Sequence, residues 1–272
     1  MVPQRFAGKV CLVTGATGIA AASARRLAAE GGRVVVASRT EADCIELVEA
    51  ITAGGGEAGY DVADLAEAGA ADRIVAAVTT RYRRLDALFN VAGGSGRRFG
   101  DGPIHEATAE GWDATLDLNA RSLFLTCRAG VRQMLAQDPD DDGLRGAILN
   151  MGSVTSTHPS PTHFATHAYA AAKGAIRSLT LTMASYYAPH RIRVNAVAPA
   201  VTRTPMAERA ASDPEIVDFV RWKQPLVGGL LEPEHIVGAA AFLLSSEASA
   251  ITGQILDIDA GWGLTDAPRE PT

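Results

Sequence analysis

KVCLVTGATGIAAASARRLAAEGGRVVVASR, residues 9–39, is the stretch that decides the fold. An apolar run rich in β-branched residues (9–14) leads directly into a glycine turn, and an Ala-rich segment of helical length follows it. A second apolar run (33–38) comes next. Short apolar runs of this kind are typical of strands buried on both faces, so the stretch predicts a strand–helix–strand unit with parallel strands.

The same alternation continues along the chain, which predicts a parallel sheet with helices on both of its faces. We expect an α/β fold of the Rossmann-like, doubly wound type with about seven strands. It forms one domain over residues 1–272, with a substrate segment at about 203–232 and a tail at 265–272. Further strands are expected at 85–91, 146–151, 191–197 and 253–258, and helices at 18–30, 41–53, 64–82, 108–137, 165–188 and 233–246.

Composition narrows the class of partner. The net charge is -6, and nucleic-acid binding usually needs an excess of Lys and Arg, so a small-molecule substrate is expected rather than a nucleic acid. The cysteines Cys11, Cys44 and Cys127 form no CxxC pair, which favours reduced thiols in the cytoplasm. No stretch reaches the roughly 18 apolar residues of a membrane span, so no membrane partner is expected.

The glycine turn, residues 14–20, lies where a dinucleotide fold binds pyrophosphate. Glycines allow the tight turn, and the helix start offers free N–H groups and a positive dipole to the phosphates. We therefore expect Gly15, Thr17, Gly18 and Ile19 to contact a dinucleotide cofactor.

The end of the second strand bears on the choice of cofactor. An acidic residue there would bind a ribose 2′-hydroxyl, but the sequence has Ser38 and Arg39, which suit a 2′-phosphate and favour NADP over NAD. In the alternative interpretation, Arg39 only pairs with Glu41 or Asp43 at the next helix start, where Thr40 resembles a capping residue.

Tyr169 and Lys173 lie four residues apart on a predicted helix, so their side chains share one face. A nearby ammonium stabilises a phenolate and makes the phenol a better acid or base. Ser153 follows the strand at 146–151, at the sheet edge where α/β folds bind ligands. Asn119 lies inside a predicted helix although asparagine has a low helix propensity, so we expect something other than propensity to place it there.

These motifs resemble those of the short-chain dehydrogenase/reductases over residues 7–262. The resemblance implies a catalytic tetrad in which Tyr169 is the general acid/base, Lys173 lowers its pKa and holds the nicotinamide ribose, Ser153 positions the carbonyl and Asn119 anchors a water. It also implies a homotetramer or homodimer. The matching positions, in order, are the glycine turn, Asp61-Val62, NVAG at 90–93, Asn119, Ser153, Tyr169 with Lys173, Asn195, Pro199, Thr204-Pro205 and residues 251–262.

The implied activity is hydride transfer between a nicotinamide cofactor, NADPH being favoured, and a ketone or secondary alcohol. The alternatives are a nicotinamide-using isomerase or dehydratase, and a nicotinamide-sensing protein without turnover. Besides the glycine turn, Ser38 and Arg39, the cofactor residues implied are Asp61, Val62, Asn90, Ala92, Gly93, Tyr169, Lys173, Val201 and Thr204.

The sequence departs from the family at two turns. Only two residues separate Gly15 from Gly18, one fewer than usual, and Ala20 replaces the last glycine of the motif. Ala200 follows Pro199 where the family has glycine, so strain is expected there if the position needs a positive φ.

The loop at 154–168 is about three residues longer than in the family and carries His158, His163 and His167. We expect no metal site, because no acidic or thiol ligand accompanies the histidines. The hypothesis is that His163 or His167 contacts a polar substrate. The pair Arg97-Arg98 either attracts an anionic substrate group or is a solvated pair of loop charges.

Two further features of the sequence have open interpretations. Phe219 and Trp222 form either an apolar wall of the substrate pocket or part of the core. The acidic stretch 137–146 is expected to be a solvated loop between a helix and the next strand.

Overall fold

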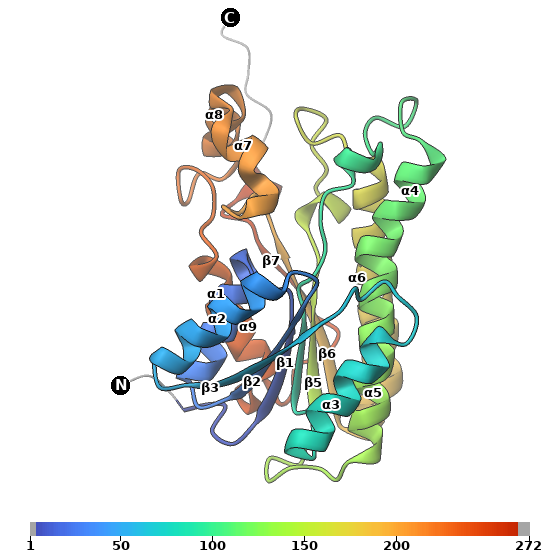
Figure 1. Cartoon of the computed structure of the whole chain (residues 1–272). Coiled ribbons are helices and arrows are strands. Elements are labelled where there is room, and N and C mark those ends of the chain that lie inside the picture. Colours follow the sequence, from blue (N-terminus) through green and yellow to red (C-terminus); the bar gives the residue numbers. More distant parts are fainter. Residues whose placement is uncertain (1–3, 266–272) are drawn as a thin grey trace, which may run out of the picture.

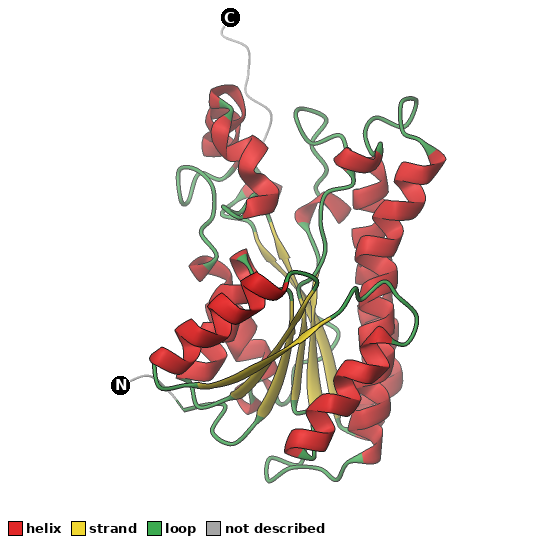
Figure 2. Ribbon diagram, viewed as in Figure 1, coloured by secondary structure: helices red, strands yellow, loops and turns green. Residues whose placement is uncertain are grey.

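The computed structural model describes residues 4–265. The predicted tail, except for its first residue, lies outside the described residues. Seven parallel strands form one sheet in the order β3-β2-β1-β4-β5-β6-β7 (Figures 1 and 2). The predicted doubly wound fold is therefore confirmed. The strands are β1 (Val10–Thr14), β2 (Arg33–Ser38), β3 (Glu57–Val62), β4 (Ala87–Asn90), β5 (Gly146–Met151), β6 (Ile192–Pro199) and β7 (Ile255–Ile258).

Helices cover both faces of the sheet, and each face has its own apolar core (Figure 1). Strand order reverses between β1 and β4, which makes this point the ligand-binding crevice of a doubly wound sheet. One face carries α1 (Gly18–Ala29), α2 (Glu41–Ala53) and α9 (Glu234–Leu244), and the other carries α3 (Ala70–Tyr82), α5 (Ser122–Ala136) and α6 (His167–Tyr187).

Strand β3 was not among the runs predicted from hydrophobicity. Its sequence EAGYDV is exposed or half-buried at every position except Gly59, because β3 is an edge strand with one neighbour. The strands predicted from apolar runs include β1, β4, β5 and β6, which are buried along their whole length. Hydrophobic runs thus identify central strands and miss this edge strand.

The predicted helix at 108–137 is interrupted. Helix α4 (Ala109–Leu116) passes into a π-helical turn, Asp117–Arg121, before α5 begins. Asn119 lies in this turn and is fully buried. Single π-helical turns inside helices often occur at functional sites, and this one directs Asn119 toward the loop after β4.

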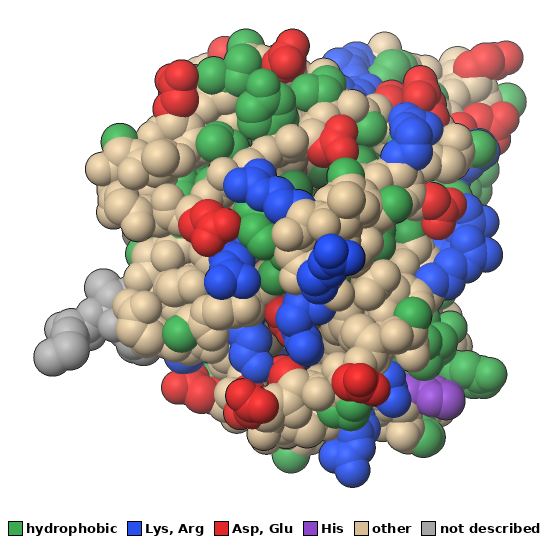
Figure 3. Space-filling model, turned by 60° about the horizontal axis from the view of Figure 1, so that its bottom comes forward, with side chains coloured by type: hydrophobic (Ala, Val, Ile, Leu, Met, Phe, Trp, Pro, Cys, Tyr) green, Lys and Arg blue, Asp and Glu red, His purple; other side chains and the backbone are tan. Residues whose placement is uncertain are grey.

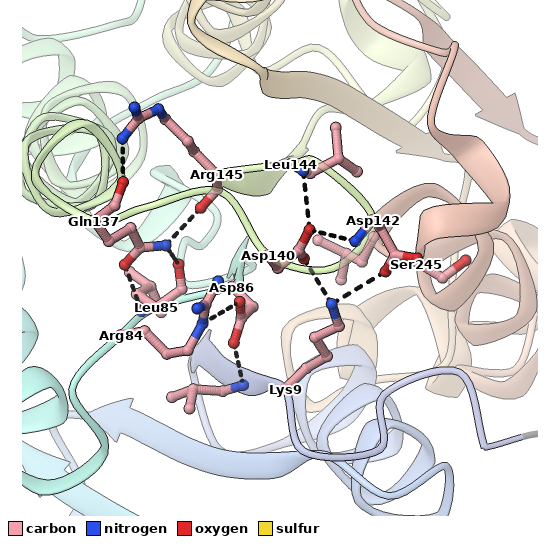
Figure 4. A network of polar contacts seen from close by, with 12 residues as sticks. Lys9, Arg84, Leu85, Asp86, Gln137, Asp140, Asp142, Leu144, Arg145 and Ser245 are labelled. Carbon is pink, nitrogen blue, oxygen red and sulfur yellow. Dashed lines mark hydrogen bonds and ion pairs between the residues drawn. The ribbon is translucent and has the colours of Figure 1, made fainter.

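The amino-terminal edge of the sheet is held by charged contacts (Figure 4). Lys9 Nζ lies 2.6 Å from an Asp140 oxygen and 3.1 Å from an Asp142 oxygen. The stretch 137–146 is a largely exposed loop between α5 and β5, as predicted, and these ion pairs also anchor it to the start of β1. Basic and acidic side chains are interspersed over this face of the molecule (Figure 3).

The segment at about 203–232, predicted to contact substrate, forms a small lobe above the carboxyl-terminal edge of the sheet, where Figure 1 shows α7 (Glu208–Ser212) and α8 (Pro214–Lys223) in orange. A third apolar cluster, which includes Ile216, Val220 and Trp262, packs beneath it. Within residues 4–265, none of the helices has the length and apolar character that a membrane crossing requires.

Candidate active site

Helix α6 brings Tyr169 and Lys173 together as predicted. Lys173 is 3% exposed, and its Nζ lies 5.4 Å from the centre of the Tyr169 ring. The ammonium donates a hydrogen bond of 2.9 Å to the Met151 carbonyl, at the end of β5. This bond fixes the position of the cation between the last residue of a buried strand and the phenol.

Ser153 stands two residues beyond β5, and its hydroxyl lies near enough to the Tyr169 phenol to lower the pKa of that phenol. Its Oγ also accepts hydrogen bonds from the Thr155 backbone N–H, at 3.3 Å, and from the Thr155 hydroxyl, at 3.0 Å. Ser153 is 7% exposed, so the hydroxyl is held in place and shielded from bulk water. The serine and the phenol therefore present two hydroxyls at one point of the cleft.

Burial sets the acid–base properties of the pair. It raises the pKa of Tyr169 to about 12, although the hydrogen bond with Ser153 acts in the opposite direction. Burial also lowers the pKa of Lys173 to about 8. Burial therefore outweighs the effect of Ser153 on the phenol, and the effect of Lys173 on that pKa stays a prediction.

Asn119 joins the π-helical turn to the loop after β4. Its Nδ2 donates to the Thr115 carbonyl at 2.9 Å and to the Gly94 carbonyl at 3.0 Å, while its Oδ1 accepts from the Gly94 N–H at 3.1 Å. A Cβ on Gly93 would lie 2.6 Å from Asn119 Oδ1, so only glycine allows this close approach. The side chain of Asn119 thus shapes the cavity wall and is not itself among the lining residues.

One cavity of about 620 Å³ joins the predicted catalytic and cofactor regions. This volume lies within the usual range for small-molecule sites. Seven of the residues predicted from the sequence to form the site line the cavity: Ile19, Arg39, Gly93, Ser153, Tyr169, Val201 and Thr204.

The glycine turn fits a phosphate-binding role despite its shortened sequence. Gly15 has φ +94° and Gly18 has φ +54°, and a Cβ on Gly18 would lie 2.8 Å from Thr204 Cγ2. Thr17 is the exposed residue before α1, and its side chain makes no capping hydrogen bond to the helix start. The backbone N–H groups of the helix start are thus suited to an anionic group such as pyrophosphate. Ala20 is buried against Gly15 without displacing the turn.

The residues predicted to contact the adenosine part of the cofactor lie at the ends of β2 and β3. Asp61 and Val62 end β3, and Val62 is 41% exposed. Arg39, just after Ser38 at the end of β2, pairs with Asp64 at 3.5 Å rather than with either acid at the start of α2. The Thr40 hydroxyl makes no capping hydrogen bond, so the predicted cap is wrong in that respect.

Two positions implied by the resemblance to contact the cofactor have hydrogen-bond partners within the protein. The amide of Asn90 points into the core, where it donates to Asn150 Oδ1 at 3.0 Å and accepts from the Thr126 hydroxyl at 2.6 Å. Its side chain is therefore not part of the cavity wall. The Val201 N–H donates to Gln224 Oε1 at 2.8 Å, while Val201 itself lines the cavity.

The remaining positions behave more simply. The backbone N–H of Ala92 donates to the Thr14 hydroxyl at 3.0 Å, which places Ala92 beside the glycine turn at the crevice. Ala200 is not among the residues with positive φ, so the expected strain is absent there.

The hypothesis of a histidine contact with substrate is not supported, because His158, His163 and His167 are all absent from the cavity wall. His163 has φ +63°, and its ring packs edge-on against Phe219 at 5.3 Å. The apolar wall of the cavity is formed by Phe164 and Trp262. Phe219 packs against both of them, while Trp222 packs against Phe219 away from the lining.

Sequence reasoning missed Asp101 and Arg209. Asp101, 5% exposed, accepts hydrogen bonds from the backbone N–H groups of Ala168 and Tyr169 at 2.9 and 3.0 Å. Arg209 lines the cavity from α7. No local pattern marks either residue, because each acts on a segment distant in the sequence.

Comparisons with known proteins agree with this architecture. A family model described as enoyl-(acyl carrier protein) reductase matches residues 13–263. The A-factor type γ-butyrolactone 1′-reductase (1S-forming) of Streptomyces virginiae is 36% identical over 94% of this chain and 96% of its own. The 3β-hydroxysteroid dehydrogenase 1 of Eggerthella lenta is 35% identical over 94% of each chain.

A solved structure is also similar to this chain in fold and in sequence. It is described as an NAD(P)-dependent gluconate 5-dehydrogenase from Beutenbergia cavernae with NADP bound at low occupancy. It superposes with a TM-score of 0.85 and is 33% identical over 96% of this chain and 98% of its own. The match of sheet order, site and sequence along nearly the whole length leads to one conclusion: this chain belongs to the short-chain dehydrogenase/reductases, a family of oxidoreductases.

Proposed function

We propose that this enzyme interconverts a ketone and a secondary alcohol, using Tyr169 as the proton donor and acceptor. The observation that carries the proposal is the phenol of Tyr169, which lines one cavity with Ser153 and the start of α1 and is backed by the buried Lys173 ammonium. The pair lies at the carboxyl-terminal edge of the sheet, where open α/β folds bind their ligands.

The chemistry assigned to the protein is proton transfer and positioning. The Ser153 hydroxyl donates a hydrogen bond to the substrate carbonyl oxygen and holds it beside the phenol. Since the pKa of Tyr169 is about 12, the phenol is protonated at neutral pH and can give its proton to that oxygen during reduction. The Lys173 ammonium then stabilises the phenolate through the short distance across the ring. A bound nicotinamide cofactor supplies the hydride.

The cofactor proposed is NADP, with NAD as the alternative. Gly15, Gly18 and Ile19 would hold the pyrophosphate at the start of α1, and Arg39 would hold the 2′-phosphate. Arg39 is about half exposed, and its one ion pair among the described residues, with Asp64, is long at 3.5 Å. An exposed pair of this kind contributes little, so its guanidinium can be redirected to a phosphate at small cost.

The exposed helix faces and the cysteines extend the proposal to the assembly and the compartment of the protein. Large apolar side chains on the outer surfaces of α4, α5 and α6 favour assembly with further copies of this chain, as a homotetramer or homodimer. Trp112, Phe124, Leu135 and Leu181 are 39–45% exposed there. The three buried free thiols support a reducing compartment such as the cytoplasm. Light scattering of the purified protein tests the assembly.

The test of the function is a screen of ketones with NADPH and of secondary alcohols with NADP, followed through nicotinamide absorbance. We expect turnover by the native enzyme and a loss of about 10²- to 10⁴-fold in Tyr169→Phe, because the variant lacks the transferable proton. Tyr186→Phe is the matched control, since Tyr186 lies on the same helix but is 69% exposed. Full turnover by Tyr169→Phe would overturn the mechanism.

A further inference from the structure

The charged residues that line the cavity are all arginines. Among the described residues, Arg39, Arg97, Arg98 and Arg209 belong to its wall, and no Asp, Glu, Lys or His does. The protein as a whole has a net charge of -6, so this concentration of one sign is a local feature and does not reflect composition. A cleft lined by one sign of charge concentrates ligands of the opposite sign.

Arg39 stands at the adenosine end of the cavity, and the other three lie near the enlarged loop. Arg97 and Arg209 come from segments more than a hundred residues apart, yet both donate to a single atom. Their terminal nitrogens lie 2.9 and 3.0 Å from the carbonyl oxygen of His163. Two guanidinium groups that converge on one oxygen have the geometry of an oxyanion site.

The carbonyl of His163 does not neutralise these cations. No ion pair among residues 4–265 uses Arg97, Arg98 or Arg209. Burial and the neighbouring charge of Arg209 both lower the pKa of Arg97, while the Asp101 carboxylate acts in the opposite direction. The two cations therefore face each other across a shared neutral acceptor. An anionic oxygen in the same place would relieve that repulsion.

The same loop connects this pair to the reacting groups. His163 has the left-handed conformation that disfavours residues other than glycine. The residue after it, Phe164, and then Thr166 line the cavity that contains Ser153 and Tyr169. A substrate bound at the phenol therefore extends along this loop toward the two guanidinium groups.

We propose that Arg97 and Arg209 bind an oxyanion, a carboxylate or a phosphate, carried by the substrate at a distance from its carbonyl. Arg98 adds to the positive potential of the entrance. The inference rests on the proposed function, since it names the class of ketone or alcohol that the same site accepts. It assigns selectivity for anionic substrates to two arginines that belong to neither the tetrad nor the cofactor site.

The test compares matched pairs of ketones that differ in charge. One pair is 4-oxopentanoate and its methyl ester, and the other is dihydroxyacetone phosphate and dihydroxyacetone. We expect the native enzyme to prefer the anion of at least one pair in kcat/KM, and the preferred pair identifies carboxylate or phosphate. Arg97→Gln and Arg209→Gln should each lower kcat/KM for that anion by about 10- to 100-fold, the effect of losing a hydrogen bond to a charged group.

The neutral partners should react within about threefold of the native rate in both variants, because the reacting groups are untouched. Arg203→Gln is the matched control, since Arg203 lies on the same segment but pairs with Glu232 and is absent from the cavity wall. If both variants slow neutral and anionic substrates equally, the arginines only anchor the loop through His163, and the proposal is wrong.

Direct binding separates this proposal from the proposed function. Calorimetric titration of the NADP-loaded enzyme with the same four compounds should show weaker anion binding in Arg97→Gln and Arg209→Gln, whether or not turnover occurs. Absence of any charge preference in binding and in kcat/KM overturns the anion site. Tyr169-dependent turnover of the neutral ketones would, in that case, leave the proposed function intact.

Discussion

The carboxylate of Asp101 holds the start of the helix that carries Tyr169, and its removal should weaken both stability and catalysis. The two oxygens accept from the backbone N–H groups of Ala168 and Tyr169 at 2.9 and 3.0 Å. Thr166, at the N-cap position of α6, makes no side-chain capping hydrogen bond to the helix start. Asp101 thus takes the capping role from a loop more than 60 residues upstream.

The magnitude follows from these two bonds. A hydrogen bond to a charged group contributes about 1.5–3 kcal/mol, and a negative charge at a helix N-terminus adds about 0.3–1 kcal/mol. Because water partly replaces the lost acceptor, we expect Asp101→Ala to lower the free energy of unfolding by about 3 kcal/mol. Asp101→Asn keeps one oxygen acceptor and should lose about half as much. Movement of the Tyr169 backbone should also lower kcat by about tenfold.

Urea unfolding followed by circular dichroism measures the stability, and steady-state kinetics with NADPH measure kcat. Asp213→Ala is the matched control. Asp213 caps α8 through two N–H groups at 3.0 and 3.4 Å, but at an exposed helix start. It should cost about 1 kcal/mol. If Asp101→Ala is no more destabilising than Asp213→Ala, or leaves kcat unchanged, the positioning role of Asp101 is refuted.

Three further predictions concern the site. Lys173 has a pKa of about 8 instead of the ordinary 10.5, so it loses its positive charge as pH rises through about 8. A pH–rate profile should show kcat/KM for reduction falling over the same range. Between pH 8 and 10.5 the Lys173 amine is protonated in the unfolded chain but not in the folded one, so the free energy of unfolding of the native enzyme should rise with pH across that window. Urea unfolding at several pH values measures this rise, which should be absent in Lys173→Met. Arg39→Ala should raise KM for NADPH by about tenfold and leave KM for NADH within about twofold, whereas equal effects would contradict the 2′-phosphate assignment. Asn119→Ala removes the three hydrogen bonds of a buried side chain and should lower the free energy of unfolding by about 2–4 kcal/mol. A loss under about 1 kcal/mol would show that Asn119 does not hold the loop after β4.

Much of the fold was predictable because its central strands are buried on both faces and read as apolar runs. The edge strand β3 and the break between α4 and α5 were not. The first is half polar, and the second depends on contacts between Asn119 and Gly94, which lie 25 residues apart. Periodicity within a segment carries no information about either feature.

The catalytic pair was predictable for a related reason: helical spacing and strand order alone bring Tyr169, Lys173 and Ser153 to one sheet edge. The orientation of individual polar groups in the loops and at the strand ends was not predictable. His163 faces Phe219 and offers its carbonyl to two arginines, while Asn90 turns its amide into the core. Such orientations depend on which distant polar group is available as a partner.

We expect the site to favour reduction over oxidation at neutral pH, because burial keeps the phenol of Tyr169 protonated. A single environment raises the pKa of Tyr169 to about 12 and lowers that of Lys173 to about 8, so the resting pair near pH 7 is a neutral phenol beside an ammonium. A neutral phenol is the proton donor that reduction needs, whereas oxidation needs a phenolate. Forming that phenolate inside the cleft requires a nearby cation, and Lys173 loses its charge before Tyr169 loses its proton. The role proposed for the Lys173 ammonium is to stabilise the phenolate, which amounts to opposing the rise that burial causes in the pKa of Tyr169.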